Sequence, residues 1–485
     1  MVALADPRPN AESPVQDVPL CVDLDGTLIR SDLLLESALA LLRQSPLHAL
    51  LLPLWLAQGR ARLKREIAQR VELDASLLPY DEHVLAFLRD DCRERRRILC
   101  TASDTRLAQA VADHVGAFDE VMASDGARNL AGTTKREALS ARFGERGYDY
   151  AGNERRDLKV WQGARRAVVV GGDGSLARAA AAVCEVEREF PRERGGLRTW
   201  MKALRLHQWL KNLLVFLPLL AAHRLFDSSA VLPAGVAFLA FGLCASGVYL
   251  LNDLLDLDAD RRHPRKRLRP FAAGTLSLHY GVLAAPLLAL AGLALALALS
   301  PLFAAVLGGY YALTLAYSLR LKRIEMLDVV VLAALYTVRI IGGAAVIGGG
   351  LSFWLLAFSM FLFLSLAMLK RYTELLSMQS NGKVDASGRG YSVEDLPLIQ
   401  SLGGASGYLS VLVLALYINS TASEALYRHP RVLWLLCPLL LYWISRVWMK
   451  AHRGLMHDDP VVFAVTDRVS QAILALCAAV ALGAI

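Results

Sequence analysis

The feature that most constrains this chain is a set of long apolar stretches confined to its C-terminal part. From Trp209 onward we count nine stretches of about the length that crosses the ~30 Å hydrocarbon core of a bilayer. They lie at 209–225, 231–251, 280–299, 301–319, 327–349, 352–369, 406–422, 432–449 and 470–485. Up to about residue 205 the chain is charge-rich instead. With 55% hydrophobic residues overall, the chain is too apolar for an ordinary soluble enzyme, and the contrast predicts a soluble domain joined to an all-α membrane domain.

The charged loops between these stretches indicate how the chain crosses the membrane. Basic residues concentrate in the loops that follow even-numbered stretches: Arg261, Arg262, Arg265, Lys266, Arg267, Arg269, Arg320, Lys322, Arg323, Lys370, Arg371, Lys383, Arg389, Lys450 and Arg453. The opposite loops contain only Arg224, Arg428 and Arg431. Cytoplasmic loops carry an excess of Lys and Arg. We therefore expect a multi-pass protein of the bacterial inner membrane, with the N-terminal domain and the active sites in the cytoplasm and Ile485 outside. The net charge of +8 fits such loops, and we expect no nucleic-acid partner.

Changes in composition divide the chain into four segments. We expect a flexible N-terminus over 1–17, a soluble domain over 18–185, a linker with an interfacial helix over 186–205, and the membrane domain over 206–485. In the linker, Leu197, Trp200, Met201 and Leu204 follow the i, i+3, i+4, i+7 pattern of a helix lying in the headgroup layer. A simple continuation of the first span explains that pattern equally well.

The soluble domain contains two short apolar runs that each end in polar residues. The run 18–22 leads into Asp23-Leu24-Asp25-Gly26-Thr27, and the run 97–100 leads into Thr101. Strands of this kind, separated by helical stretches, predict an α/β fold with a doubly wound parallel sheet and a site at the strand ends. Two carboxylates at i and i+2 in a turn can divide nucleophilic and proton-transfer roles, and both can approach magnesium.

Four ordered motifs make residues 18–185 similar to the haloacid dehalogenase (HAD) phosphatases. They are DLDGT, a Thr closing the next strand, a Lys further on, and GNERRD at 152–157. The resemblance implies that Asp23 is the nucleophile and Asp25 the general acid/base. The other roles that it implies are phosphoryl binding by Thr101 and Lys135, and Mg²⁺ binding by Asp23, Asp25, Asn153 and Asp157.

This domain departs from the family pattern at one ligand. HAD phosphatases usually have an Asp where Asn153 stands, which weakens the expected magnesium site and leaves open a degenerate scaffold without turnover. The apolar stretch 33–56, interrupted by Pro46 and Pro53, predicts a helical cap. Contact with the membrane and burial against the core are both compatible with that cap.

An acidic segment closes the second apolar stretch. On a helix, Asn252, Asp256 and Asp260 stack at i, i+4 and i+8, with Asp253 beside Asp256. Carboxylates crowded next to hydrocarbon repel one another and are costly to leave unpaired. A divalent cation relieves both problems, and magnesium keeps open positions for substrate phosphates.

This segment and its surroundings resemble the UbiA intramembrane prenyltransferase superfamily over about 200–485. The matching residues are Asn252-Asp253-x-x-Asp256-x-x-x-Asp260, then His263-Pro264 and Arg269-Pro270, and the opening Arg205-x-x-Gln208-Trp209-x-Lys211-Asn212. The resemblance implies nine spans and Mg²⁺-assisted departure of a diphosphate from the substrate.

Three later segments resemble one branch of that superfamily, the decaprenyl-phosphate phosphoribosyltransferases. They are Lys370-Arg371-Tyr372-Thr373-Glu374, Gly388-Arg389-Gly390-Tyr391 and Met456-His457-Asp458-Asp459-Pro460. Aromatic prenyltransferases usually carry a second aspartate-rich motif where this chain has one carboxylate, Glu374, and two cations. If the donor carries a 5-phosphate and the acceptor is itself a phosphate, the binding site must supply more positive charge than in an aromatic prenyltransferase.

Arg339 is the only Arg or Lys deep inside an apolar run. An intramembrane charge is a functional candidate, and binding of the lipid phosphate and an ion pair with an aspartate are both open to it. The other residues that we assign to substrate binding are Lys211, Lys266, Arg269, Lys322, Lys370, Arg371 and Tyr391, and the remaining metal candidate is Glu374.

The sequence therefore predicts a bifunctional membrane enzyme. The membrane domain would transfer 5-phosphoribose from phosphoribosyl diphosphate to a polyprenyl phosphate, with Mg²⁺ held by Asn252, Asp256 and Asp260. The HAD domain would remove the 5-phosphate, which gives polyprenylphosphoryl ribose for arabinofuranose-type cell-envelope glycans. The alternative is an aromatic, 4-hydroxybenzoate-type polyprenyltransferase with a regulatory or degenerate HAD domain. A homo-oligomer is compatible with the sequence.

Overall fold

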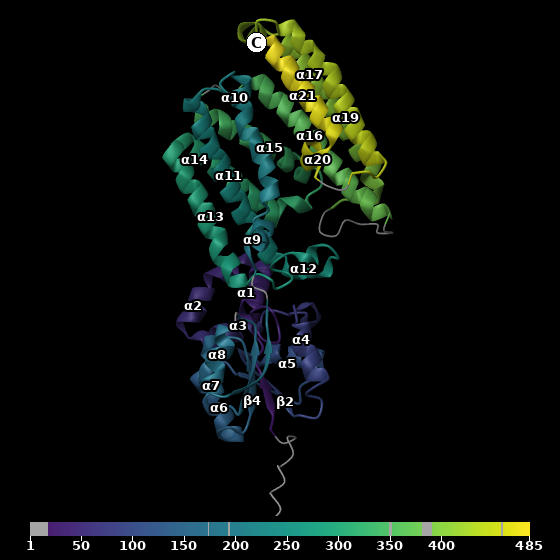
Figure 1. The fold of residues 1–485 in the computed structure, drawn as a ribbon. Helices are drawn as coiled ribbons and strands as arrows, with labels where there is room; N and C mark the ends of the chain where they lie inside the picture. Colours follow the sequence, from purple (N-terminus) through teal and green to yellow (C-terminus); the bar gives the residue numbers. More distant parts are fainter. Residues whose placement is uncertain (1–17, 173, 193–194, 349–351, 381–389, 457–458) are drawn as a thin grey trace, which may run out of the picture. The chain divides into compact units, whose positions relative to one another are not determined.

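The computed structural model describes residues 18–485 apart from 173, 193–194, 349–351, 381–389 and 457–458 (Figure 1). The expected flexible N-terminus 1–17 and the motif residues Arg389, His457 and Asp458 lie outside the described residues. The chain divides into two compact units. One comprises residues up to 203 together with 250–284, and the other comprises 204–249 and 285–485.

The first unit is built on a six-stranded sheet in the order β3-β2-β1-β4-β5-β6, with every neighbouring pair parallel. The strands are β1 (Leu20–Val22), β2 (Arg97–Asp104), β3 (Glu120–Ser124), β4 (Asp149–Gly152), β5 (Arg166–Val170) and β6 (Glu185–Phe190). The strand order reverses direction between β1 and β4, where a doubly wound sheet places its site. The predicted parallel α/β sheet is confirmed.

Helices cover both faces of this sheet (Figure 1). Apolar side chains of α4 (Glu82–Arg89) and α5 (Thr105–Val115) pack on one face. Those of α6 (Thr133–Phe143), α7 (Leu158–Trp161) and α8 (Ser175–Ala181) pack on the other. The strands in between are buried on both faces, as a parallel sheet requires.

The segment expected to be a linker, 186–205, contributes to this domain instead. Its first residues form the edge strand β6. The Arg192 guanidinium then donates hydrogen bonds to the Asp81 carboxylate and to the carbonyl of Gly26. A helix does follow, α9 (Leu197–Ala203), and Leu197 and Met201 are exposed on it.

The apolar stretch after the first motif forms several short helices. They are α1 (Leu33–Gln44), η2 (Pro46–Leu50) and α2 (Leu52–Ala57), and α3 (Arg60–Ala68) follows them. Leu41, Trp55, Ile67 and Val71 form a small core of their own. The leucines at 47, 50, 54 and 56 are exposed, so only part of the stretch is buried.

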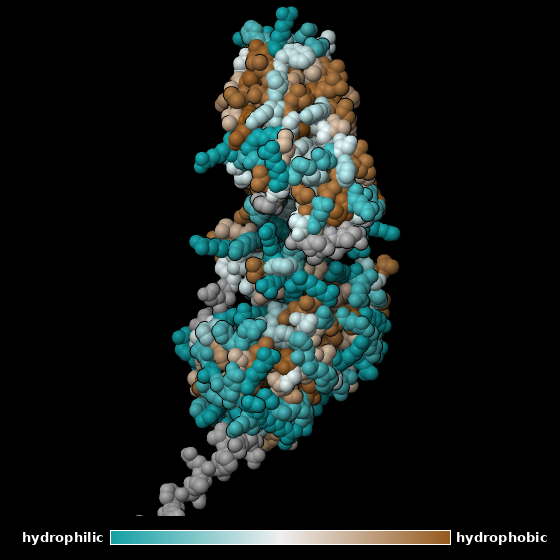
Figure 2. Space-filling model, turned by 90° about the vertical axis from the view of Figure 1, so that its right-hand side faces the viewer, coloured by the Kyte–Doolittle hydropathy of each residue, from teal (hydrophilic) through white to brown (hydrophobic). Residues whose placement is uncertain are grey.

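The second unit is helical. Within the described residues, seven helical segments are long and apolar enough to cross a membrane: Ser228–Leu255, Leu278–Leu299, Pro301–Leu319, Leu327–Ile347, Phe353–Ser380, Val393–Ile418 and Pro430–His452. They contain α11, α13, α14, α15, α16, α17 and α19 in that order. Much of this unit carries hydrophobic side chains on its surface, whereas the α/β part is mainly hydrophilic (Figure 2). A multi-pass membrane protein explains both properties.

The first and the last of the nine expected spans are not confirmed. The first, 209–225, consists of a 3₁₀ segment, η5 (Leu206–Phe216), and the short helix α10 (Leu217–Ala221). The last corresponds to α21 (Arg468–Ala484), a helix of 17 residues. Between α19 and α21 lies α20 (Pro460–Thr466).

The acidic segment lies where α11 (Ser228–Leu255) gives way to α12 (Leu257–Arg262). Asp256 lies between the two helices, but backbone hydrogen bonds of the helical i, i+4 type continue across it. The Asp256 amide donates to the Asn252 carbonyl at 2.9 Å, and the Asp260 amide donates to the Asp256 carbonyl at 2.8 Å. This segment and the following η6 (Lys266–Leu268) pack as part of the α/β unit.

Candidate active sites

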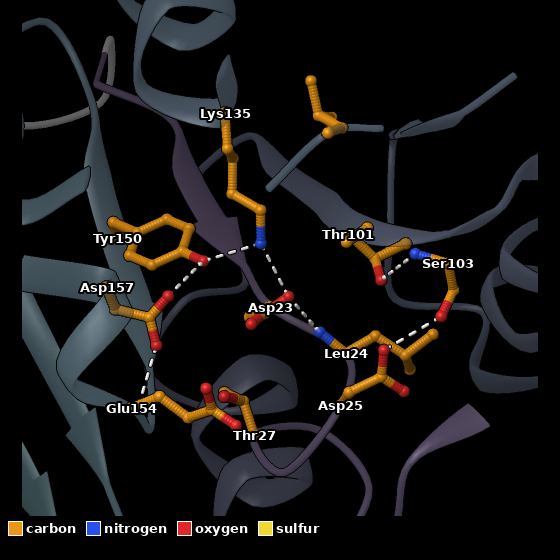
Figure 3. A network of polar contacts seen from close by, with 12 residues as sticks. Asp23, Leu24, Asp25, Thr27, Thr101, Ser103, Lys135, Tyr150, Glu154 and Asp157 are labelled. Carbon is orange, nitrogen blue, oxygen red and sulfur yellow. Dashed lines mark hydrogen bonds and ion pairs between the residues drawn. The ribbon is translucent and has the colours of Figure 1, made fainter. Parts of the chain in front are cut away.

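The first candidate site lies at the carboxyl ends of β1, β2 and β4. Asp23 and Asp25 follow β1, and Figure 3 shows Thr101 and Ser103 of β2 on one side of them. The Ser103 hydroxyl donates to Asp25 Oδ2 at 2.9 Å, and the Leu33 amide donates to Asp25 Oδ1 at 2.7 Å. The Ser103 amide donates to Thr101 Oγ1 at 3.0 Å. These bonds fix the orientation of the Asp25 carboxyl group.

A buried lysine faces Asp23 from the opposite side (Figure 3). Lys135, on α6, donates from Nζ to Asp23 Oδ1 at 2.8 Å and to the Tyr150 hydroxyl at 2.9 Å. The Tyr150 hydroxyl in turn donates to Asp157 Oδ1 at 3.2 Å. Burial is the largest single influence on Lys135 and opposes its charge, but Asp23, Cys100 and Asp157 together raise the pKa of Lys135. The site therefore holds a permanent cation beside its first carboxylate.

Two carboxyl groups of this site titrate near neutral pH. Burial, followed by the charges of Asp32 and Asp23, raises the pKa of Asp25 to about 7. Burial and the charge of Asp23 raise the pKa of Asp157 to about 6. Groups with pKa values near the working pH suit proton transfer, and crowded carboxylates attract a cation.

The position of Asn153 fits a metal site that has one neutral ligand. Its side-chain Oδ1 accepts a hydrogen bond from the Thr27 hydroxyl at 3.2 Å, and its backbone N–H donates to Asp157 Oδ2 at 2.9 Å. Gly26 adopts a φ of +73°, and a Cβ there would lie 2.1 Å from the Asn153 side chain. Glycine thus permits the turn that brings the residues after β1 and β4 together. Within the described residues, no cluster of three or more His, Cys, Asp or Glu side chains has metal-binding geometry.

Sequence reasoning missed Lys64 and Tyr150. Lys64, on α3, donates from Nζ to the Ala102 carbonyl at 2.5 Å and to Asn129 Oδ1 at 3.0 Å. Lys64 lies in a basic stretch of a helix, Arg60 to Arg65, which by itself resembles a solvated face. Tyr150 lies inside a strand whose pattern indicates only burial.

In the acidic segment, two carboxylates share one guanidinium. Arg269 Nη1 lies 3.1 Å from Asp253 Oδ1 and 2.6 Å from Asp260 Oδ2, and both aspartates are buried. Arg269 was expected to bind substrate, and its bonds place it among the predicted metal ligands. Asn252 and Asp256 are half-buried at the same helix end. Lys266 lies exposed on η6.

In the helical unit, two lysines converge on Asp459. Lys211 Nζ, from η5, lies 2.6 Å from Asp459 Oδ2, and Lys370 Nζ, from α16, lies 3.3 Å from the same oxygen. The Tyr336 hydroxyl lies 3.5 Å from Asp459 Oδ1. Lys211 and the Asp459 carboxylate are largely buried. This lysine–aspartate cluster is formed by Lys211, Tyr336, Lys370 and Asp459.

Arg339 lies buried on α15 (Leu327–Ile347) among neutral partners. Its Nε donates to Asn212 Oδ1 at 2.9 Å, one of its terminal nitrogens donates to the Tyr310 hydroxyl at 2.9 Å, and the other donates to the Leu335 carbonyl. None of the described ion pairs joins Arg339 to an aspartate. These contacts therefore do not show the ion pair with an aspartate that was one alternative for Arg339.

Arg371 lies in a network of its own. Its guanidinium is paired with Asp328 and Glu374 and donates to the Tyr317 hydroxyl at 3.0 Å. The Tyr391 hydroxyl also donates to Asp328, at 2.5 Å. Three residues predicted to bind substrate or metal, Arg371, Tyr391 and Glu374, thus bind one another or Asp328. Lys322 is half-buried on η7 (Leu321–Arg323).

Comparisons with known proteins cover most of the chain. The model of the UbiA prenyltransferase family matches residues 213–384. The uncharacterized protein y4nM of Sinorhizobium fredii is 40% identical over 466 residues, which cover 95% of this chain and 90% of that protein. The nodulation protein NoeC of Azorhizobium caulinodans is 39% identical over 273 residues, which cover 56% of this chain and 87% of that protein.

Another relative is the decaprenyl-phosphate phosphoribosyltransferase of Corynebacterium glutamicum. It is 32% identical over 230 residues, which cover 46% of this chain and 69% of that protein. Among solved structures, a UbiA homolog from Archaeoglobus fulgidus bound to GPP and Mg²⁺ aligns with a TM-score of 0.46 at 17% identity. That alignment covers 59% of this chain and 99% of the solved chain.

Proposed function

The chain belongs to the UbiA prenyltransferase family, and on this premise we propose that its helical domain transfers 5-phosphoribose from phosphoribosyl diphosphate to a polyprenyl phosphate. The observation that carries this proposal is the lysine–aspartate cluster. Among the described residues, the single carboxylate of Asp459 faces two lysines of the helical unit. Phosphate groups of a donor and a lipid acceptor can supply the second negative charge. The relatives named decaprenyl-phosphate phosphoribosyltransferase, 32% to 39% identical over the matched regions, support the same substrates.

In the proposed transfer, an oxygen of the polyprenyl phosphate attacks C1 of the ribose. The C1–O bond to the diphosphate breaks, the diphosphate departs with the bonding electrons, and C1 inverts. The nucleophile is already an anion, so no general base is required. Lys211, Lys370 and Arg339 would position the phosphates, and positioning with charge stabilisation would provide most of the rate.

The acidic segment offers oxygen ligands of the kind that magnesium prefers. We assign the metal to Asn252, Asp256 and Asp260, with Asp253 beside them. Magnesium bound there would stabilise the departing diphosphate.

For the α/β domain we assign a phosphatase activity of the HAD type, directed at the 5-phosphate of the lipid product. Asp23 would attack the phosphorus while Asp25 gives its proton to the sugar oxygen as the P–O bond breaks. Water would then attack the aspartyl phosphate, Asp25 would accept a proton from the water, and inorganic phosphate would leave. The pKa of Asp25, about 7, supports both proton transfers.

Thr101 and Lys135 would bind the phosphoryl oxygens in this reaction. The oxygens of Asp23, Asn153 and Asp157 suit magnesium, which would neutralise the charge between the nucleophile and the phosphate. We place both active sites on the cytoplasmic side of the bacterial inner membrane. The product would be polyprenylphosphoryl ribose, a precursor for arabinofuranose-type cell-envelope glycans.

The transfer is tested with ribose-labelled phosphoribosyl diphosphate and a polyprenyl phosphate in proteoliposomes that contain the full chain. We expect label in the lipid fraction, and loss of that label in Lys211→Gln. Lys450→Gln, at the end of α19 (Leu436–His452), is the matched control and should retain transfer. Label that remains in the aqueous phase contradicts the proposal. Transfer of a polyprenyl chain from its diphosphate to 4-hydroxybenzoate would identify an aromatic prenyltransferase instead.

The phosphatase is tested separately by release of inorganic phosphate from soluble phosphomonoesters, with and without Mg²⁺. We expect Mg²⁺-dependent release that disappears in Asp23→Asn. An absence of release from every phosphomonoester would identify the α/β domain as a scaffold without turnover.

A further inference from the structure

Lys64 is a partly buried cation of the α/β domain that the proposed phosphatase does not use. Lys64, on α3, donates hydrogen bonds to a backbone carbonyl and to the amide oxygen of Asn129. Both acceptors are neutral, and none of the ion pairs among the described residues involves Lys64. A lysine that loses solvent without a direct bond to a carboxylate recovers little of its desolvation cost. Such a site is suited to an anion that arrives from outside the protein.

The contacts of Lys64 place it beside the catalytic end of β2. The carbonyl that it binds, at 2.5 Å, belongs to Ala102, the residue between Thr101 and Ser103. Ser103 donates to Asp25 at 2.9 Å. The Lys64 ammonium therefore lies next to the strand end that carries one predicted phosphoryl-binding residue and the hydrogen-bond partner of the general acid.

The electrostatic surroundings indicate which side of the site Lys64 faces. Burial lowers the pKa of Lys64, and the charges of Asp25 and Asp32 are the strongest that oppose this shift. Asp25 must contact the leaving oxygen in order to protonate it. Because Lys64 binds the carbonyl next to Ser103, the hydrogen-bond partner of Asp25, it lies toward the leaving group, whereas Lys135 lies against the nucleophile, Asp23.

We propose that Lys64 is a specificity-determining residue that binds a negative charge on the leaving group of a phosphomonoester. The inference rests on the phosphatase activity proposed above. It predicts that the preferred substrate carries two phosphate groups, one that is hydrolysed and one that stays on the alcohol. A ribose with a 5-phosphate and a phosphodiester at C1 belongs to this class, since the diester keeps one negative charge after the 5-phosphate is removed.

The test compares two soluble substrates with the full chain in detergent. One is ribose 5-phosphate, whose leaving group is neutral, and the other is ribose 5-phosphate with a methyl phosphodiester at C1. Removal of a charge-assisted hydrogen bond should lower kcat/KM for the diester by roughly 10- to 100-fold in Lys64→Gln. We expect kcat/KM for ribose 5-phosphate to change by less than about threefold, because the phosphoryl-binding residues are intact.

Two variants make this test specific. Arg65→Gln removes the neighbouring, exposed cation, which donates a hydrogen bond to the carbonyl of Asp125, and it should leave kcat/KM for both substrates unchanged. Lys64→Arg keeps the charge and should keep the preference for the diester. Equal losses on both substrates, or no loss on either, would overturn the inference about Lys64. A wild-type chain that hydrolyses neither substrate would overturn the proposed phosphatase instead.

Discussion

At the scale of single residues, the charge around Asp25 would set the pH range of the proposed phosphate release. Its pKa of about 7 results from burial, from Asp32 and from Asp23. Because the general acid must be protonated, kcat/KM should fall as the pH rises through about 7. Asp32→Asn removes a nearby negative charge, which favours the ionised form of Asp25 and lowers its pKa. The alkaline limb of the pH profile of kcat/KM should therefore move to lower pH.

Asparagine also retains the hydrogen bond by which Asp32 caps α1, from the Leu35 amide at 2.9 Å. Asp113→Asn, at an exposed site on α5, removes the same charge elsewhere and should leave the profile in place. An unchanged alkaline limb in Asp32→Asn would show that the limb does not report Asp25.

The neutral ligand Asn153 leads to a second prediction at this scale. Asn153→Asp adds a carboxylate beside Asp23 and Asp157 and keeps an oxygen that can accept the Thr27 hydrogen bond. Carboxylates bind Mg²⁺ more strongly than amides do, so half-maximal phosphate release should require less Mg²⁺. Titration of phosphate release with MgCl₂ measures the change. A requirement that stays equal or increases would place the metal away from Asn153.

The residues that sequence could predict differ physically from those that it could not. Asp23 and Asp25 follow β1, and Thr101 lies in the carboxyl-terminal half of β2, so their convergence at one sheet edge follows from parallel strand order. Lys64 reaches the same edge from a helix whose sequence is simply basic. The pairing of Lys211 with Asp459 joins residues 248 positions apart, and neither sequence position indicates the other.

At the scale of elements, the same distinction explains the strands and spans. β1 and β2 are continuous apolar runs, and they were predicted. β6 (Glu185–Phe190) is mostly charged, with Val186 and Phe190 as its apolar residues, and it lies at the sheet edge. Its sequence therefore resembles that of a linker. The stretch 209–225 is apolar enough for a span but begins as a 3₁₀ segment with Lys211 and Asn212 buried. Hydropathy does not distinguish a 3₁₀ segment from an α-helix.

The prediction at this scale concerns the ion pair between helices α1 and α12. Glu36, on α1, is buried and pairs with Arg261 of α12 through oxygen–nitrogen distances of 2.6 and 3.1 Å. Glu36→Gln leaves the buried guanidinium without its counter-charge and should destabilise the protein by about 3–5 kcal/mol. Thermal unfolding of the purified chain measures this loss.

The neighbouring pair supplies the control. Asp74 and Arg262 lie 3.2 Å apart, and both side chains are exposed. Asp74→Asn should change the stability by about 1 kcal/mol or less. If both variants unfold alike, the Glu36–Arg261 pair contributes no more than a surface contact.

At the scale of the whole molecule, the two proposed active sites would act in sequence on one lipid, and each can be inactivated alone. Asp23→Asn removes the proposed nucleophile and should stop phosphate release. Transfer should continue, because this variant leaves the acidic segment and the lysine–aspartate cluster intact. A lipid that carries both ribose and its 5-phosphate should then accumulate, and mass spectrometry of the lipid extract measures it.

The reciprocal variant completes the argument. Asp256→Asn removes a proposed metal ligand and should stop transfer, while phosphate release from a soluble phosphomonoester continues. Asp258→Asn changes a half-buried carboxylate on the same helical turn but off the face shared by Asn252, Asp256 and Asp260, and transfer should persist. If the wild-type chain accumulates the phosphorylated lipid as Asp23→Asn does, the α/β domain acts on another substrate. The fusion would then couple two unrelated activities.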